Sequence, residues 1–167
     1  MAEKIGWEGR FFEDFEVGDL YRHPLGRSIT EADNIWFTLL TQNTNPSHFD
    51  NEYAKATPFK QVLVNSCFTL SLVTGQSVTD LSQNAIANLA WTEITLPRPV
   101  FLGDTIHSRS EVLALRESKS RPEAGIVDVR TEGYNQRGEV VIAYKRTIMV
   151  YKRAARPHLP TNSAGPA

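Results

Sequence analysis

The second half of the chain consists almost entirely of predicted strands, and this pattern limits most strongly what the protein can fold into. Each of four long segments is rich in the β-branched and aromatic residues that favour strands: residues 85–96, 105–117, 125–135 and 140–151. Turn residues separate the segments at Pro97-Arg98-Pro99, at 121–125 and at 135–138. Because short turns join antiparallel neighbours, the pattern predicts an antiparallel sheet.

One helix is predicted to lie against this sheet. Asn65 or Ser66 can cap it, and it should run to about residue 81. Its apolar side chains leave little of its surface polar, which is typical of a buried helix: Cys67, Phe68, Leu70, Leu72, Val73 and Val78. We therefore expect an α+β hot-dog fold, a curved antiparallel sheet wrapped around one long central helix. The sheet edges would need cover, which favours a homodimer.

The first half is predicted to contain shorter elements. Residues 20–29 could form a first strand, and residues 50–56 a short helix. Thr30 and Asp33 have the spacing of a capping box, so a helix should follow to about Thr41. Its predicted apolar stripe comprises Ala32, Ile35, Trp36, Leu39 and Leu40.

Two tryptophans, the cysteine and three histidines carry expectations about burial. Trp36 and Trp91 fit core positions at helix or strand spacing. Cys67, the single cysteine, excludes an internal disulfide and is expected to be a buried, inert thiol. His23, His107 and His158 lack a polar constellation and are expected at the surface.

The bulk composition indicates one ordinary globular domain. The 167 residues, 41% of them hydrophobic, suit a single domain over residues 1–153, with an Ala-, Pro- and Ser-rich disordered tail over 154–167. The net charge of −1 gives no broad attraction to nucleic acid or to a membrane. The polar N-terminus does not look like a secretory signal, so we expect a cytoplasmic location. No metal site is expected, because no two candidate ligands share a recognised spacing.

The candidate chemistry lies in the loop Asn43-Thr44-Asn45-Pro46-Ser47-His48. Histidine can take or give a proton near neutral pH, and an amide five residues earlier could hold a water beside it. The alternative is an Asn/Pro turn with a solvent-exposed histidine, and spacing alone leaves the two interpretations about equal.

The sequence resembles the MaoC-like dehydratase family, which includes the (R)-specific enoyl-CoA hydratases. The family signature is approximately Gly-Asp-x-Asn-Pro-(Leu/Ile)-His, then a short helix and Phe-Gly-x-x-(Val/Ile)-x-x-Gly. Residues 42–48 occupy the first motif and residues 59–66 the second, and the Gly103-Asp104 turn follows in the expected order. The resemblance covers about residues 12–152. It implies a hydratase or dehydratase of acyl-CoA thioesters, with coenzyme A as part of the substrate and no separate cofactor.

The resemblance also implies roles for particular residues. His48 would be the acid/base, and the Ser66 N–H at the start of the central helix would stabilise the enolate-like oxygen. The family's catalytic Asp is Asn43 here, and an amide can orient a water but cannot act as a base. Asn at this position resembles a branch associated with short branched dicarboxylic acyl-CoA substrates of the mesaconyl, itaconyl or β-methylmalyl kind. Asn45 and Asn65 would contact the substrate.

Basic side chains could hold the negative groups of such a substrate. Lys119 and Arg121, in a charged hairpin, could meet the coenzyme A phosphates or a second carboxylate, although such hairpins are usually only solvated. Arg98, between two prolines, is a further candidate.

Two other functions stay open at this point. One is a non-catalytic acyl-CoA-binding protein, which the Asn43 substitution would favour. The other is a hot-dog thioesterase, which generally uses an acidic residue on or near the central helix. Here that helix offers only Asp80, at its far end.

Overall fold

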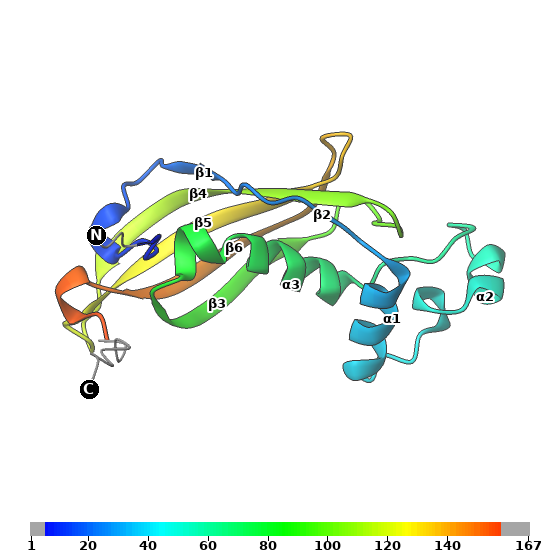
Figure 1. Cartoon of the computed structure of the whole chain (residues 1–167), viewed down its shortest axis with the longest axis horizontal. Helices are drawn as coiled ribbons and strands as arrows, with labels where there is room; N and C mark the ends of the chain where they lie inside the picture. Colours follow the sequence, from blue (N-terminus) through cyan, green and yellow to red (C-terminus); the bar gives the residue numbers. More distant parts are fainter. Residues whose placement is uncertain (1–5, 158–167) are drawn as a thin grey trace, which may run out of the picture.

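The computed structural model describes residues 6–157, and Figure 1 shows one sheet with a helix lying across its face. The six strands are β1 (Leu20–Arg22), β2 (Arg27–Ser28), β3 (Ala85–Thr95), β4 (Thr105–Glu117), β5 (Ala124–Tyr134) and β6 (Val140–Tyr151). Their order is β1-β4-β5-β6-β3, with β2 also paired to β4, and every pairing is antiparallel. The four predicted long strands and their antiparallel arrangement are confirmed.

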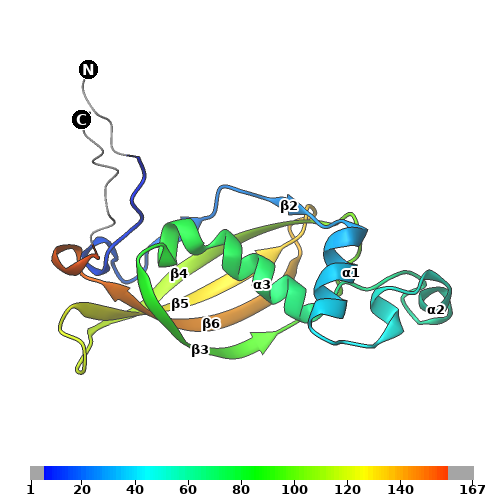
Figure 2. The same ribbon diagram turned by 60° about the horizontal axis from the view of Figure 1, so that its bottom comes forward.

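The central helix α3 (Ser66–Gln76) lies in the concave side of the curved sheet, as Figure 2 shows. One face of α3, centred on Val73, packs on β-sheet side chains such as Ile142 and Tyr144. The opposite face, which carries Cys67 and Gly75, is exposed, so the expected burial of Cys67 is wrong. The helix ends five residues earlier than predicted and continues as a π-helical turn, Val78–Ser82.

The helix α1 (Glu31–Leu40) begins where the capping box predicts, with Thr30 accepting from the Asp33 N–H and Asp33 reaching back to the Thr30 N–H. Its predicted apolar stripe, however, faces outward, because Trp36 is 78% and Leu40 82% exposed. The inward positions are Asn34 and Thr38, both 0% exposed. Asn34 contacts loop backbone and Thr38 contacts the Asn65 side chain, and buried polar groups need such polar partners. The expectation that Trp36 is a core residue is therefore wrong.

The predicted first strand is interrupted, because β1 and β2 are separated by the segment 23–26. Pro24 has no N–H to donate to a ladder, and a side chain at Gly26 would collide with the His107 ring. His23 turns inward at this break and is buried, which corrects the expectation of a surface residue.

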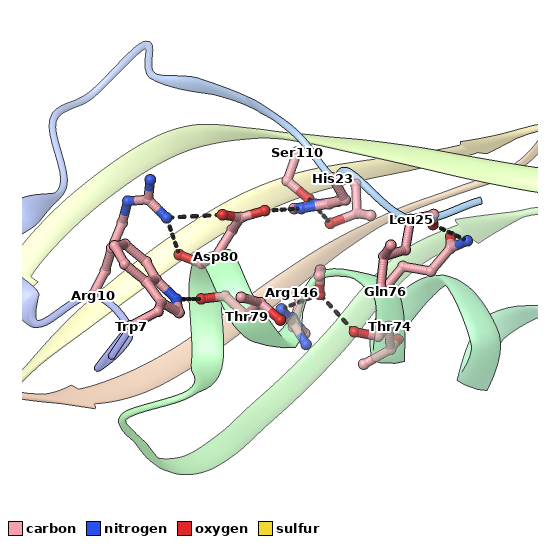
Figure 3. Close-up of polar contacts among 12 residues, drawn as sticks. Trp7, Arg10, His23, Leu25, Thr74, Gln76, Thr79, Asp80, Ser110 and Arg146 are labelled. Atoms are coloured by element: carbon pink, nitrogen blue, oxygen red, sulfur yellow. Dashed lines mark hydrogen bonds and ion pairs between the residues drawn. The ribbon is translucent and has the colours of Figure 1, made fainter. Parts of the chain in front are cut away.

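His23 belongs to a polar cluster beneath the end of α3, which Figure 3 shows. Its Nδ1 lies 2.8 Å from Asp80 Oδ2, and its Nε2 lies 2.9 Å from Ser110 Oγ. Arg10 Nη1 also contacts Asp80 Oδ1, at 2.9 Å. Burial lowers the pKa of His23 below its usual value, against the opposing effect of Asp80. Nearby, Arg146 is buried and donates to Ser77 Oγ.

The edge strand β3 is open along one side. Its side chains Leu89, Trp91 and Ile94 are exposed, so the expected burial of Trp91 is also wrong within this chain. No helix within residues 6–157 is both long and apolar enough to cross a membrane. The predicted tail begins at residue 154, and its residues 158–167, with His158, lie outside the described part of the chain.

Candidate functional site

The loop that carries the candidate motif is built by its own amide side chains. It follows α1 and contains the 3₁₀ turn Pro46–His48, which precedes the short helix α2 (Asn51–Ala56). Asn43 Oδ1 accepts from the Asn45 N–H at 3.0 Å, and Asn45 Oδ1 accepts from the Ser47 N–H at 3.1 Å. Proline at the first position of the turn suits its fixed φ. These contacts hold His48 at the end of a defined turn.

His48 is held in one orientation by a backbone carbonyl. Its side chain is mostly buried (8% exposed), and its Nδ1 lies 2.8 Å from the Leu63 carbonyl oxygen. Because a carbonyl can only accept, Nδ1 must carry the proton in this contact. In the neutral ring Nε2 then has the free lone pair, so it is the atom that can accept a proton.

The helix α3 starts at Ser66, shortly after Leu63 in the sequence. Asn65 caps the helix, because its Oδ1 accepts from the Cys67 N–H at 2.9 Å. Its Nδ2 donates to Thr38 Oγ1, so the structure engages both ends of the Asn65 amide inside the protein. The first N–H groups of a helix lack intrahelical acceptors and favour an anion. The exposed Ser66, first residue of α3, is thus placed to present its N–H to a ligand.

A cavity of about 240 Å³ opens over this helix start. It is lined by Phe59, Leu63, Val64, Ser66, Thr69 and residues 96–100. His48 and Asn43 are not among the lining residues, but Leu63, whose carbonyl holds His48, is. The lining is mostly apolar with a few polar groups, which is the usual character of a small-molecule site.

Arg98 is the only ionisable side chain among the lining residues. It is about half exposed, and its Nε lies 3.6 Å from Glu139 Oε1, too far for a strong hydrogen bond. The pKa of Glu139 is lowered, first by the hydrogen bond from Asn135 and then by that from Arg137. Arg98 is therefore the predicted basic residue that the structure brings to the cavity.

Lys119 and Arg121 lie elsewhere. They belong to the β4–β5 connection, which lies at the end of the sheet opposite α1 and α2 (Figures 1 and 2). Arg121 also contacts Glu123 within the same turn, at 3.4 Å. The structure does not bring these two residues to His48 within one chain, and their role stays a prediction.

Sequence reasoning missed Asn34 and Thr38, the two buried polar residues of α1. Asn34 donates to the carbonyls of His48 and Leu63, and Thr38 accepts from the Asn65 side chain. A signal was present, since the two lie four residues apart and so share one face of the helix. The apolar stripe beside them instead favoured the prediction that the other face of the helix is buried.

The mesaconyl-CoA hydratase family model matches residues 3–161. A mesaconyl-CoA hydratase from Cereibacter sphaeroides is 37% identical over 155 residues, which are 92% of this chain and 45% of that protein. The chain thus spans about half the length of this relative.

Solved structures agree on the fold. A MaoC domain protein dehydratase from Chloroflexus aurantiacus matches with a TM-score of 0.85 and 32% identity, over 98% of this chain and 46% of that one. A Mycobacterium tuberculosis protein described as having a double hotdog fold matches with a TM-score of 0.79 and 20% identity, over 98% of this chain and 53% of that one. The predicted α+β hot-dog fold is confirmed.

Proposed function

The chain belongs to the mesaconyl-CoA hydratase family, and from this premise we propose that its site hydrates or dehydrates a 2-enoyl-CoA thioester. The observation that carries the proposal is the His48 contact to the Leu63 carbonyl, which leaves Nε2 as the proton-accepting atom and ties the ring to the segment that leads into α3. An acid/base group and an oxyanion donor are the two groups that this reaction needs.

The proposed hydration proceeds in two steps. A water gives a proton to His48 Nε2 while its oxygen bonds to C3 of the enoyl group, and the electron pair of the double bond moves onto the thioester oxygen. The N–H of Ser66, at the N-terminus of α3, stabilises that oxygen. The imidazolium then returns the proton to C2, which restores neutral His48 and the thioester. Dehydration is the same sequence in reverse.

Asn43 has a positioning role in this proposal. Its Oδ1 is engaged by the Asn45 N–H, which leaves the Nδ2 donors to orient water or substrate. The proposed substrate is a short branched dicarboxylic acyl-CoA of the mesaconyl type, with Arg98 as the cation at the cavity. Asn45 stays a predicted substrate contact, although its side chain caps the 3₁₀ turn. A cytoplasmic location also stays a prediction.

The position of Asp80 argues against a thioesterase that relies on this residue. This residue lies past the C-terminal end of α3 and is held by Arg10 and His23. A helix the length of α3 is about 16 Å long, so Asp80 lies far from Ser66.

The first test replaces the acid/base. His48→Ala should lower the rate of hydration by about 10²–10⁴-fold, because a positioned general acid/base typically contributes that much. Loss of enoyl absorbance from crotonyl-CoA and mesaconyl-CoA measures the rate, and a thiol reagent detects thioester hydrolysis. His107→Ala, which removes a half-buried histidine stacked on Tyr134, is the matched control. A folded His48→Ala variant with near wild-type turnover would contradict the mechanism. Thiol release by the wild type would favour a thioesterase.

The second test addresses Asn43. Asn43→Asp keeps the side-chain volume and an oxygen for the Asn45 N–H, so the turn should survive. It removes the amide donors and adds a negative charge, so we expect turnover of mesaconyl-CoA to fall, by roughly 10²-fold for the loss of one well-placed donor. Steady-state kinetics with mesaconyl-CoA and crotonyl-CoA measures the effect. An inactive wild type that this substitution revives toward crotonyl-CoA would instead favour the binding-protein alternative.

The third test separates two roles of Arg98. If its guanidinium binds the second carboxylate of the substrate, Arg98→Gln should raise KM for mesaconyl-CoA roughly tenfold, the size expected for one hydrogen-bonded charge, and leave KM for crotonyl-CoA unchanged. Equal increases with both substrates would assign Arg98 to the coenzyme A phosphates. Arg116→Gln, at an exposed position of β4, controls for the lost charge. Unchanged KM values for both substrates would remove Arg98 from the site.

We also propose that a second hot-dog unit covers β3, supplied by another copy of this chain. The exposed Leu89, Trp91 and Ile94 and the open strand edge support this arrangement, as does the double length of the matched relative. Light scattering at micromolar concentration should give about twice the chain mass of 18.8 kDa, or a higher multiple of that dimer. A mass of one chain would contradict the proposal.

A further inference from the structure

We propose that Asn34 is a positioning residue that sets the His48 ring and the start of α3 in one fixed geometry. The inference rests on the proposed hydratase function only in its kinetic test. The geometry itself is a set of contacts from one buried amide to three backbone segments, and none of those contacts involves the sheet.

Asn34 has no solvent exposure, and its side chain makes three contacts. Its Nδ2 donates to the His48 carbonyl at 2.7 Å and to the Leu63 carbonyl at 3.2 Å. Its Oδ1 accepts from the Asn65 N–H at 2.9 Å. The amide thus joins the candidate motif loop, the segment before α3 and the capping residue of α3.

The Leu63 carbonyl gives this arrangement its chemical consequence. The same oxygen accepts from Asn34 Nδ2 and from His48 Nδ1. A carbonyl has two lone pairs and can serve both donors at once. By fixing this oxygen, Asn34 fixes the acceptor that keeps the His48 proton on Nδ1 and leaves Nε2 basic. It acts on the reaction through His48 and does not itself line the cavity.

The contact to Asn65 extends the effect to the helix start. Asn65 caps α3, so its placement determines where the N–H of Ser66 points. An amide is the side chain suited to this task, because it supplies two donors and an acceptor on one planar group. A carboxylate would supply acceptors only, and a hydroxyl would supply a single donor.

Two substitutions at this position test the role. Asn34→Asp keeps the volume and the acceptor for the Asn65 N–H but loses both donors, and Asn34→Ser keeps one donor in a smaller side chain. A small displacement of reacting groups can cost about 10²-fold in rate, so we expect kcat to fall by roughly that factor in Asn34→Asp and less in Asn34→Ser. KM should change little, because no contact to the cavity is lost.

Asn84 provides a matched control. Its Nδ2 also donates to two backbone carbonyls, those of Glu8 at 2.9 Å and Arg10 at 3.2 Å, but beyond the C-terminal end of α3. Asn84→Asp should lower the melting temperature without lowering kcat. If the Asn34 variants, at temperatures where all proteins are folded, lose no more kcat than Asn84→Asp, then Asn34 is merely structural and the proposal fails.

The tautomer of His48 gives a readout that does not depend on activity. In ¹⁵N-histidine-labelled wild type at a pH where the ring is neutral, His48 should show protonated Nδ1 and bare Nε2, with its signals assigned by their loss in His48→Gln. In Asn34→Asp or Asn34→Ser the spectrum should shift toward the other tautomer. A wild-type ring protonated on Nε2, or an unchanged tautomer in both folded variants, would overturn the inference. If the wild type is inactive but the Asn34 variants show the expected tautomer shift, the proposed function is overturned and the positioning role still holds.

Discussion

The geometry of the candidate site depends on the carbonyl oxygen of Leu63. This oxygen belongs to an extended segment between α2 and α3, where no helix or strand ladder supplies a partner apart from an isolated bridge to Phe101. Side chains supply the partners instead, from Asn34 on one side and His48 on the other. Buried peptide groups need hydrogen-bond partners. The contact between the Leu63 carbonyl and His48 therefore satisfies the carbonyl and fixes the orientation of the imidazole at the same time.

The same need for polar partners explains why α1 turns polar side chains inward and its apolar stripe outward, against a simple hydrophobic criterion. Its inward face meets polar groups, loop carbonyls at Asn34 and the Asn65 amide at Thr38, so both residues are buried while Trp36 is exposed. A helix face is normally judged by apolar periodicity, and that rule assumes that the neighbour is an apolar core. Here the neighbour is a set of polar groups. The exposed stripe that results is a surface that a second unit could cover, in line with the open edge of β3.

The two ends of α3 differ in a way that determines where chemistry can occur. The N-terminal end opens on the cavity and is capped by Asn65, whose other contacts lie in the interior. The far end leads into a π-helical turn that carries Asp80, and a negative charge near a helix C-terminus is electrostatically unfavourable. Arg10 compensates that charge and the His23 ring also contacts the carboxylate, which makes Asp80 part of the packing. Only the N-terminal end has unsatisfied dipole groups to offer a developing oxyanion.

The elements that the sequence predicted correctly are those set by local rules. The four long strands follow from β-propensity and turn residues, and the start of α1 follows from the Thr30–Asp33 capping box. The burial of His23 was not predictable in that way, because its partners Asp80 and Ser110 lie 57 and 87 residues away. The spacing of Asn34 and Thr38 could mark a buried polar face, but it could not identify the partners of Asn34, which become neighbours only when α1, the motif loop and the start of α3 meet.

An asparagine at position 43, where the family resemblance implies an aspartate, is compatible with both the fold and the proposed chemistry. The side-chain oxygen that closes the turn onto the Asn45 N–H is present in either residue, so the loop does not require the acid. In the proposed reaction His48 Nε2 accepts the proton, so the Asn43 amide need only orient a water. Arg98 is the only ionisable residue that lines the cavity, and its contact to Glu139 is long, at 3.6 Å. In the proposed complex, Arg98 would attract a second carboxylate on the substrate, which is the electrostatic reason for proposing a dicarboxylic acyl group.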